Sequence, residues 1–254
     1  MTGLEEVAIV LTGLVAGIMT STVGVASLLS FPVLVALGLP PVVANASNTI
    51  GMTPASLTGS FGYRAELREH PVVTVTIIGT CASGAVLGAV LLLALPPGVF
   101  EAVVPWLILG TCLLVGAQPT ISRRLKQASE ATPPHQRTRL SPVTTVFSTV
   151  VGVYGGYFGA GSGVMMMAVL GFGSNLDFRI VNALKTLAIL ASNLVASVVF
   201  VFAAELDWLA IVLLASGSIV GGYVGARIGR RLNPTVLRTL IVVVGLTAAV
   251  TMLL

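Results

Sequence analysis

Long apolar runs occupy most of this chain and leave few folds open to it. They lie at residues 5–38, 42–62, 71–95, 99–117, 141–173, 179–204, 207–226 and 235–254. A helix needs about 20 apolar residues to cross the hydrocarbon core of a bilayer, and most of these runs have roughly that length. Helices and closed barrels are the structures that span membranes, because every backbone polar group must be satisfied internally. The runs therefore predict an all-α polytopic membrane protein.

The composition excludes several other classes of protein. Of the 254 residues, 56% are hydrophobic and 9% are charged, whereas an ordinary soluble domain has about 25% charged residues. A disordered chain, a secreted disulfide scaffold and a nucleic-acid-binding protein are all excluded. The net charge of +4 is interpreted as membrane topology, because Lys and Arg collect in cytoplasmic loops. Cys81 and Cys112 lie within apolar runs, and we expect them to be buried free thiols.

Two of the runs are too long for one crossing and too short for two full ones. Residues 5–38 and 141–173 each contain an interruption rich in small residues, at Gly17–Ser27 and Gly152–Gly163. Irregular backbone at membrane depth persists only where protein buries it or water lines it. We therefore expect each run to be a re-entrant hairpin whose turn lies inside the protein.

The basic loops indicate the direction of each crossing. Arg and Lys gather at 64–70, in the segment 118–140 and at 227–231, whereas the loops near 95–99 and 203–207 contain neither. By the positive-inside rule, the three basic segments face the cytoplasm. Both termini are then expected on the outside, and each long run must begin and end on one side of the membrane.

The two halves of the chain align with each other. A shift of 137 residues places Asn45 on Asn182 and holds without a gap to the end of the first half. Before Asn45 a small gap is needed, and Gly24 falls on either Gly159 or Gly163. Equivalent loops face opposite sides, so we expect an inverted-topology repeat, each half being a glycine-broken hairpin followed by three transmembrane helices. The expected organisation is a first repeat at 1–117, a cytoplasmic linker at 118–140 and a second repeat at 141–254.

The breaks and the helices that follow them carry the polar residues predicted to lie at membrane depth. A half-helix after a break presents unpaired N–H groups and a positive dipole end, which favour an anion. In inverted-repeat transporters, paired interrupted segments indicate the binding site. The alternative is that these residues serve tight helix packing and interhelical hydrogen bonds. The candidate substrate-binding residues are Ser21, Thr22, Gly24, Ser27, Asn45, Asn48, Thr49, Gly161, Ser162, Gly163, Asn182, Lys185 and Thr186.

Lys185 is the cation expected to lie farthest from the basic loops. An ionisable side chain within a membrane is costly unless its charge is compensated, so it marks a candidate functional site. No Asp or Glu lies clearly within a span to pair with it. An anionic substrate is the expected partner, and a side chain that snorkels to the cytoplasmic surface is the alternative.

A family resemblance supports this interpretation. The segment Gly152-Val-Tyr-Gly-Gly-Tyr-Phe-Gly-Ala-Gly-Ser-Gly163 resembles the glycine-rich signature of the TauE/SafE sulfite exporter family. The first copy of this signature looks like Ala16-Gly17, Gly24, Phe31-Pro32-Val-Leu and Leu37-Gly-Leu-Pro40. The family's closing segment is similar to Gly221 to Gly225 followed by Arg230-Arg-Leu-Asn-Pro234. The resemblance implies a bacterial inner-membrane protein that transports, and usually exports, small sulfur-containing anions such as sulfite or organosulfonates.

We therefore expect a secondary transporter that works by alternating access, with one half rocking against the other. An anion channel or uniporter for small oxyanions or carboxylates is the alternative, because glycine breaks and helix N-termini also line pores. An enzyme is not expected: His70 and His135 lie in loops, and no cluster in a span resembles a metal or cofactor site. The expected partners are the anionic substrate and the lipid bilayer, with a homodimer left open.

Overall fold

The computed structural model of this chain describes residues 3–131, 140–174, 176–228 and 234–253, which form helices and connecting turns without a strand. The helices are α1 (Gly3–Thr22), α2 (Ser27–Ala36), α3 (Pro41–Gly62), α4 (Arg64–Glu69), α5 (Pro71–Ala94), α6 (Pro97–Ala131), α7 (Pro142–Tyr157), α8 (Ser162–Gly173), α9 (Phe178–Ala203), α10 (Trp208–Ile228) and α11 (Pro234–Leu253). Within this part of the chain, 6 helices (α1, α5, α6, α9, α10 and α11) are long and apolar enough to cross a membrane. The prediction of an all-α polytopic membrane protein is confirmed.

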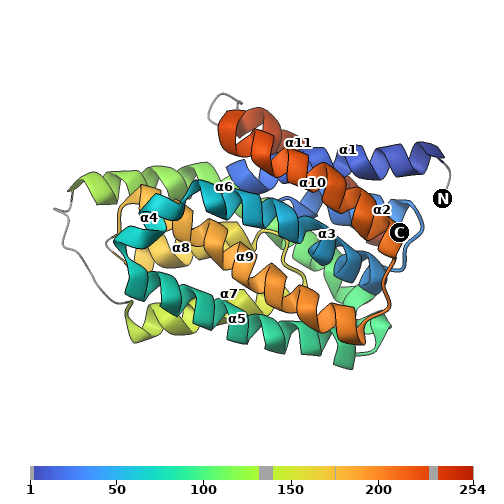
Figure 1. Ribbon diagram of the computed structural model, residues 1–254, viewed down its shortest axis with the longest axis horizontal. Helices are drawn as coiled ribbons and strands as arrows, with labels where there is room; N and C mark the ends of the chain where they lie inside the picture. The colour runs from blue at the N-terminus through green and yellow to red at the C-terminus, as the bar shows by residue number, and fades with distance from the viewer. Residues whose placement is uncertain (1–2, 132–139, 175, 229–233, 254) are drawn as a thin grey trace.

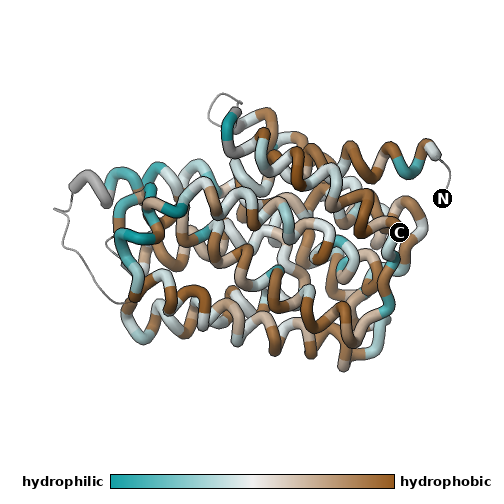
Figure 2. Tube along the Cα trace, in the orientation of Figure 1, coloured by the Kyte–Doolittle hydropathy of each residue, from teal (hydrophilic) through white to brown (hydrophobic). Residues whose placement is uncertain are grey.

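The long helices run side by side along the long axis of the molecule (Figure 1). α1 begins and α11 ends at the right of this view, whereas α4 and the C-terminal part of α6 lie at the left. Figure 2 shows many hydrophilic residues at that left end and hydrophobic residues along the helices between the two ends. This separation is the one that a bilayer imposes on a bundle of spanning helices.

Each of the two long apolar runs folds back on itself. α1 leads through a turn into α2, and α7 leads through a turn into α8. In Figure 1, α1 enters from the right and α2 returns to the right, whereas α7 enters from the left and α8 returns to the left. The breaks are shorter than the small-residue segments suggested, because α1 continues to Thr22 and α7 to Tyr157.

Glycines ahead of the breaks serve close helix packing. α1 packs against α10, and α7 packs against α5. A Cβ added at Gly17 would lie 2.8 Å from the backbone nitrogen of Gly222, and one added at Gly152 would lie 2.8 Å from the Cα of Cys81. Only glycine permits backbones to approach this closely. The packing interpretation is therefore correct for Gly17 and Gly152. Cys81 and Cys112 are free and buried, as predicted.

Helices of the first half pack against helices of the second half in matching pairs. α3 packs against α10, and α9 packs against α5. In addition, α3 packs against α9, and α6 packs against α11. When α3 is matched with α9 and α5 with α10, as in the alignment of the two halves, the contact between α3 and α10 is the counterpart of the contact between α9 and α5.

The segment after residue 117 differs from the expected loop. α6 continues through Pro119 to Ala131, because the segment contains good helix formers and Leu125 is buried. The Cβ of a residue at Gly171 would overlap the Leu125 side chain, so α6 packs on α8 here. Residues 132–139, which include His135, and residues 229–233 of the closing segment lie outside the described residues.

Candidate anion site

The two breaks have the same backbone conformation. Gly24 has φ +82° and Gly159 has φ +78°, a left-handed conformation that glycine adopts without the steric cost of a Cβ. In each break, the glycine and the residue before it donate N–H groups to one carbonyl. This carbonyl belongs to Met19 in the first break, at 2.8 and 2.9 Å, and to Tyr154 in the second, at 2.9 and 3.0 Å. Gly24 is therefore equivalent to Gly159 rather than to Gly163.

The breaks touch each other in the interior of the bundle. A Cβ added at Gly163 would lie 2.9 Å from the carbonyl oxygen of Gly24 and 2.7 Å from Cδ1 of Ile189. Beside them, the rings of Phe31 and Phe158 pack edge to face, with centroids 5.3 Å apart. The first turn of α8 therefore lies directly against the first break.

A small cavity of about 20 Å³ lies where the breaks meet α3 and α9. Its lining residues are Thr20, Gly24, Val25, Ala26, Ser27, Met52, Ser56, Gly159, Ser162, Ile189 and Asn193. A space of this size holds about one water molecule. The cavity is therefore closed in this structure, and its lining would have to move apart to admit an anion of several atoms.

Most of the polar lining comes in equivalent pairs from the two halves. Ser27 and Ser162 are the first residues of α2 and α8, and each stands three positions after the glycine of its break. Ser56 and Asn193 are 137 residues apart, and the Asn193 amide donates to Ser56 Oγ at 3.4 Å. The cavity therefore lies at the centre of the repeat, where equivalent residues meet.

Free backbone donors lie at the start of α2 and of α8. Among the described residues, none accepts a hydrogen bond from the backbone N–H of Ala26 or Gly161, which immediately precede Ser27 and Ser162. Unpaired N–H groups at the start of a helix, beside a serine hydroxyl, form an arrangement that binds anions.

Lys185 lies beside the first break. Lys185 is 1% exposed. A Cβ added at Gly24 would lie 3.5 Å from both Cε and Nζ of Lys185. In the described part of the chain, the ion pairs join Arg179 to Glu66 and Glu69, so no carboxylate pairs with Lys185. This burial does not fit a side chain that snorkels to the surface. The site therefore contains a buried lysine side chain without a carboxylate partner among the described residues.

Asn45 and Asn48 lie on α3 with unsatisfied amide atoms. The Asn45 amide nitrogen donates to the carbonyl of Tyr157 at 2.9 Å, but its Oδ1 and both amide atoms of Asn48 are buried without a partner. An unsatisfied buried polar group costs about 1–3 kcal/mol. Asn48 is the repeat equivalent of Lys185 (185 minus 48 is 137). Free donors and acceptors therefore lie at equivalent positions on α3 and α9.

Several other predicted site residues are already hydrogen-bonded. Ser21 donates to a carbonyl of α10 at 3.0 Å. Thr22, Thr49 and Thr186 donate to carbonyls four residues earlier in their own helices, at 2.9, 2.9 and 3.0 Å. The Asn182 amide donates at 2.8 Å to the hydroxyl of the tyrosine between α3 and α4. Of the predicted set, Gly24, Ser27 and Ser162 line the cavity. Ser21 and Asn182 connect separate segments of the chain, whereas the three threonines bond within their own helices.

The structure adds polar residues of α6 that the sequence analysis missed. The carbonyl of Ala160, in the second break, accepts from the hydroxyls of Tyr154 at 2.7 Å and Thr111 at 3.2 Å. The carbonyl of Val23, in the first break, accepts from the Gln118 amide at 3.2 Å. In the sequence, Thr111 and Gln118 are marked only as isolated polar residues within and just after the apolar run 99–117.

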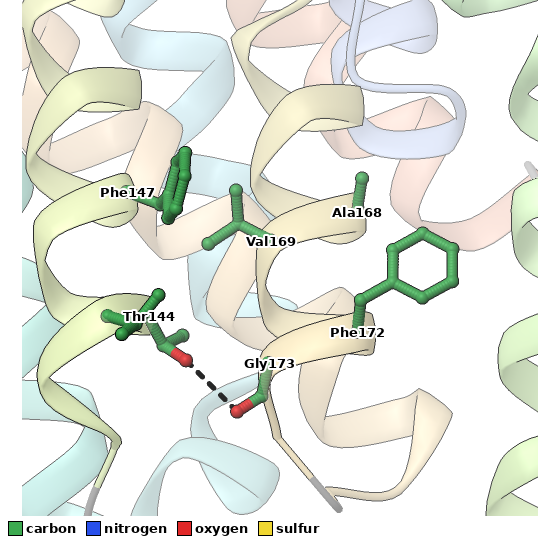
Figure 3. Close-up of a pocket in the computed structure, with 7 residues that line it drawn as sticks. Thr144, Phe147, Ala168, Val169, Phe172 and Gly173 are labelled. Atoms are coloured by element: carbon green, nitrogen blue, oxygen red, sulfur yellow. Dashed lines mark hydrogen bonds between the residues drawn. The ribbon is translucent and has the colours of Figure 1, made fainter.

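A larger pocket of about 390 Å³ lies between α7 and α8 (Figure 3). Its lining residues are Val143, Thr144, Phe147, Ala168, Val169, Phe172 and Gly173. The Thr144 hydroxyl donates to the Gly173 carbonyl at 3.0 Å, so it has no proton left for a ligand. Phe147 and Phe172 are exposed, and this pocket is an apolar surface groove rather than an anion site.

Comparison with known proteins shows similarity along nearly the whole chain. The family model described as "Sulfite exporter TauE/SafE" matches residues 9–252. The chain is 27% identical over 243 residues to "Probable membrane transporter protein ORF9" of Sinorhizobium sp, covering 94% of this chain and 88% of the relative. It is 25% identical over 250 residues to "Probable membrane transporter protein" of Haemophilus influenzae, covering 95% and 92% of the two chains. No solved structure gives a significant match.

Proposed function

From the premise that the chain belongs to the TauE/SafE sulfite exporter family, we propose that it exports small sulfur-containing anions such as sulfite or organosulfonates. Two relatives named as probable membrane transporter proteins support transport as the general activity. The observation that carries the choice of an anion is Lys185, which is 1% exposed, lies beside the first break and has no carboxylate partner in the described chain.

The anion binds in the central cavity after its walls separate. The hydroxyls of Ser27 and Ser162 and the N–H groups that precede them donate hydrogen bonds to its oxygens, and Lys185 supplies the opposite charge. Hydrogen bonds to a charged group contribute about 1.5–3 kcal/mol each, so a few such contacts are enough for binding.

Transport proceeds by alternating access between two inverted halves. The exchange of helix partners between the halves supports this arrangement, as do hairpins that enter from opposite ends of the bundle (Figure 1). Rocking of one half against the other opens the cavity to one side at a time. In the bacterial inner membrane, the end that carries α4 faces the cytoplasm and both termini face outward.

The closed cavity favours a carrier over a channel, because a space for about one water molecule is not a continuous pore. Purified protein is screened for thermal stabilisation by sulfite, thiosulfate, taurine, sulfoacetate, sulfate and simple carboxylates, since a ligand that binds the folded state raises the melting temperature. We expect sulfite and the organosulfonates to stabilise the protein more than the simple carboxylates do.

The same anions are then tested in proteoliposomes. A carrier gives saturable uptake that is accelerated by unlabelled anion inside the vesicle, whereas a channel gives large unitary currents without such acceleration. Lys185→Gln is the matched variant, because it keeps a long polar side chain and removes the charge. Wild-type protein that neither binds nor transports any of these anions would refute the proposed function.

A further inference from the structure

We propose that the central site selects singly charged anions over doubly charged ones, and that Lys185 sets this preference. The inference rests on the proposed function and concerns the charge of the substrate, which neither the family nor the named relatives specify.

Among the described residues, one buried side chain that can carry a charge lies beside the cavity. Every residue that lines the cavity is uncharged. Lys185 is the one charged residue among the described residues whose exposed fraction falls to 1%, and its Nζ lies beside Gly24. No carboxylate in the described chain pairs with it. The closed site therefore offers a bound anion one positive charge, that of the Lys185 ammonium.

Arg238 is the other cation connected to a break. Its Nε donates at 3.1 Å to Gln118, and the Gln118 amide donates to the first break. Arg238 is only partly buried, so solvent and headgroups screen its charge. It positions Gln118 and contributes little to the charge of the closed cavity.

A monoanion and the Lys185 ammonium form a neutral pair in the closed site. A dianion leaves one negative charge uncompensated in the same place. An uncompensated buried ion remains strongly disfavoured even after relaxation, and a tenfold change in affinity corresponds to about 1.4 kcal/mol. Closure around a dianion is therefore disfavoured by at least about tenfold.

Asn48 occupies the position on α3 that Lys185 occupies on α9. Its Nδ2 and Oδ1 are both buried and without a partner. At the equivalent position, α3 thus carries a neutral amide with free hydrogen-bonding atoms, which adds no second charge. A lysine at Asn48 would give the closed site two positive charges.

The test compares sulfate with sulfamate, in which an uncharged amino group replaces one charged oxygen of the same tetrahedral frame. Binding to full-length protein in detergent is measured by calorimetry, and counterflow is measured in proteoliposomes. We expect sulfamate to bind at least about tenfold more tightly than sulfate.

The Asn48→Lys protein is expected to shift the affinity ratio toward sulfate by at least about tenfold. The double variant Lys185→Gln, Asn48→Lys moves the single charge to the equivalent position on α3 and is expected to restore the preference for sulfamate. A purely structural role of Lys185 would not produce this pattern.

The wild-type comparison needs no variant and decides the proposal even if the substituted proteins do not fold. Wild-type protein that binds sulfate as tightly as sulfamate would overturn the charge preference and leave anion transport standing. A folded wild-type protein that binds and moves neither anion, nor any anion of the wider screen, would overturn both.

Discussion

Replacement of Gly163 by Ala tests whether the contact between the two breaks forms the site. The new Cβ would lie 2.9 Å from the carbonyl oxygen of Gly24 and 2.7 Å from Cδ1 of Ile189. The Ile189 methyl can rotate away, but the backbone carbonyl must retreat by a few tenths of an ångström. Overpacking of this kind costs about 1–3 kcal/mol, and Ala gains about 1 kcal/mol over Gly in a helix. The net loss of folding stability is therefore about 0–2 kcal/mol.

Anion binding should suffer more than stability. A loss of up to about 2 kcal/mol lowers the melting temperature by no more than about 8 °C in a chain of this size. The displaced break, however, moves at least one donor away from the anion, and a lost hydrogen bond to a charged group is worth about 1.5–3 kcal/mol. The affinity for the anion should fall by at least about tenfold.

The assay measures melting temperature and anion affinity for the wild type, Gly163→Ala and Gly110→Ala. Gly110 also lies within a helix, but a Cβ added there has no atom within 4 Å. Gly110→Ala should therefore be as stable as the wild type or slightly more stable, with unchanged affinity. If Gly163→Ala kept wild-type affinity, the two breaks would not form the binding site.

Three further predictions address the topology, the second break and the cavity. In a protein otherwise free of reactive thiols, Arg68→Cys should react with an impermeant reagent only from the cytoplasmic side and Glu205→Cys only from the outside; labelling from one common side would refute the inverted arrangement. Tyr154→Phe should lower stability by about 0.5–1.5 kcal/mol, measured by thermal unfolding, because the carbonyl of Ala160 loses its shorter hydrogen bond; an unchanged melting temperature would argue against this role. Ser162→Ala should weaken anion binding by about tenfold or more by calorimetry, the size expected for a lost hydrogen bond to a charged group, and unaltered affinity would remove this hydroxyl from the site.

The sequence was sufficient to predict most of the helices and the positions of both hairpins, although it placed residues 118–131 in a loop where α6 continues. Apolar length and the positive-inside rule depend on a few strong signals, which nearly every run of this chain provides. The equivalence of Gly24 and Gly159 could not be predicted, because the shift between the halves changes from 135 residues (159 minus 24) at the breaks to 137 (182 minus 45) beyond Asn45. The positive φ values and the shared hydrogen-bond pattern settle that alignment.

The sequence was less informative about which polar side chains face the cavity. Ser21 and Ser27 are similar in sequence context, yet Ser21 is hydrogen-bonded to α10 and Ser27 lines the cavity. This difference arises from the direction in which the chain turns at Gly24. Thr111 and Gln118 were missed because a single polar residue in a long apolar helix has no periodic pattern. Their role depends on contacts with breaks that are distant in the sequence.

An X-ray structure with bound selenite would test the central proposal most directly. Selenite is mostly singly charged at neutral pH, has the shape of sulfite, and contains an atom that anomalous scattering can locate. We predict a single strong anomalous peak between the first turns of α2 and α8, within contact distance of Ser27 and Ser162. A peak confined to the groove beside Phe147 or to the ends of the bundle, with the central cavity empty, would contradict the proposal.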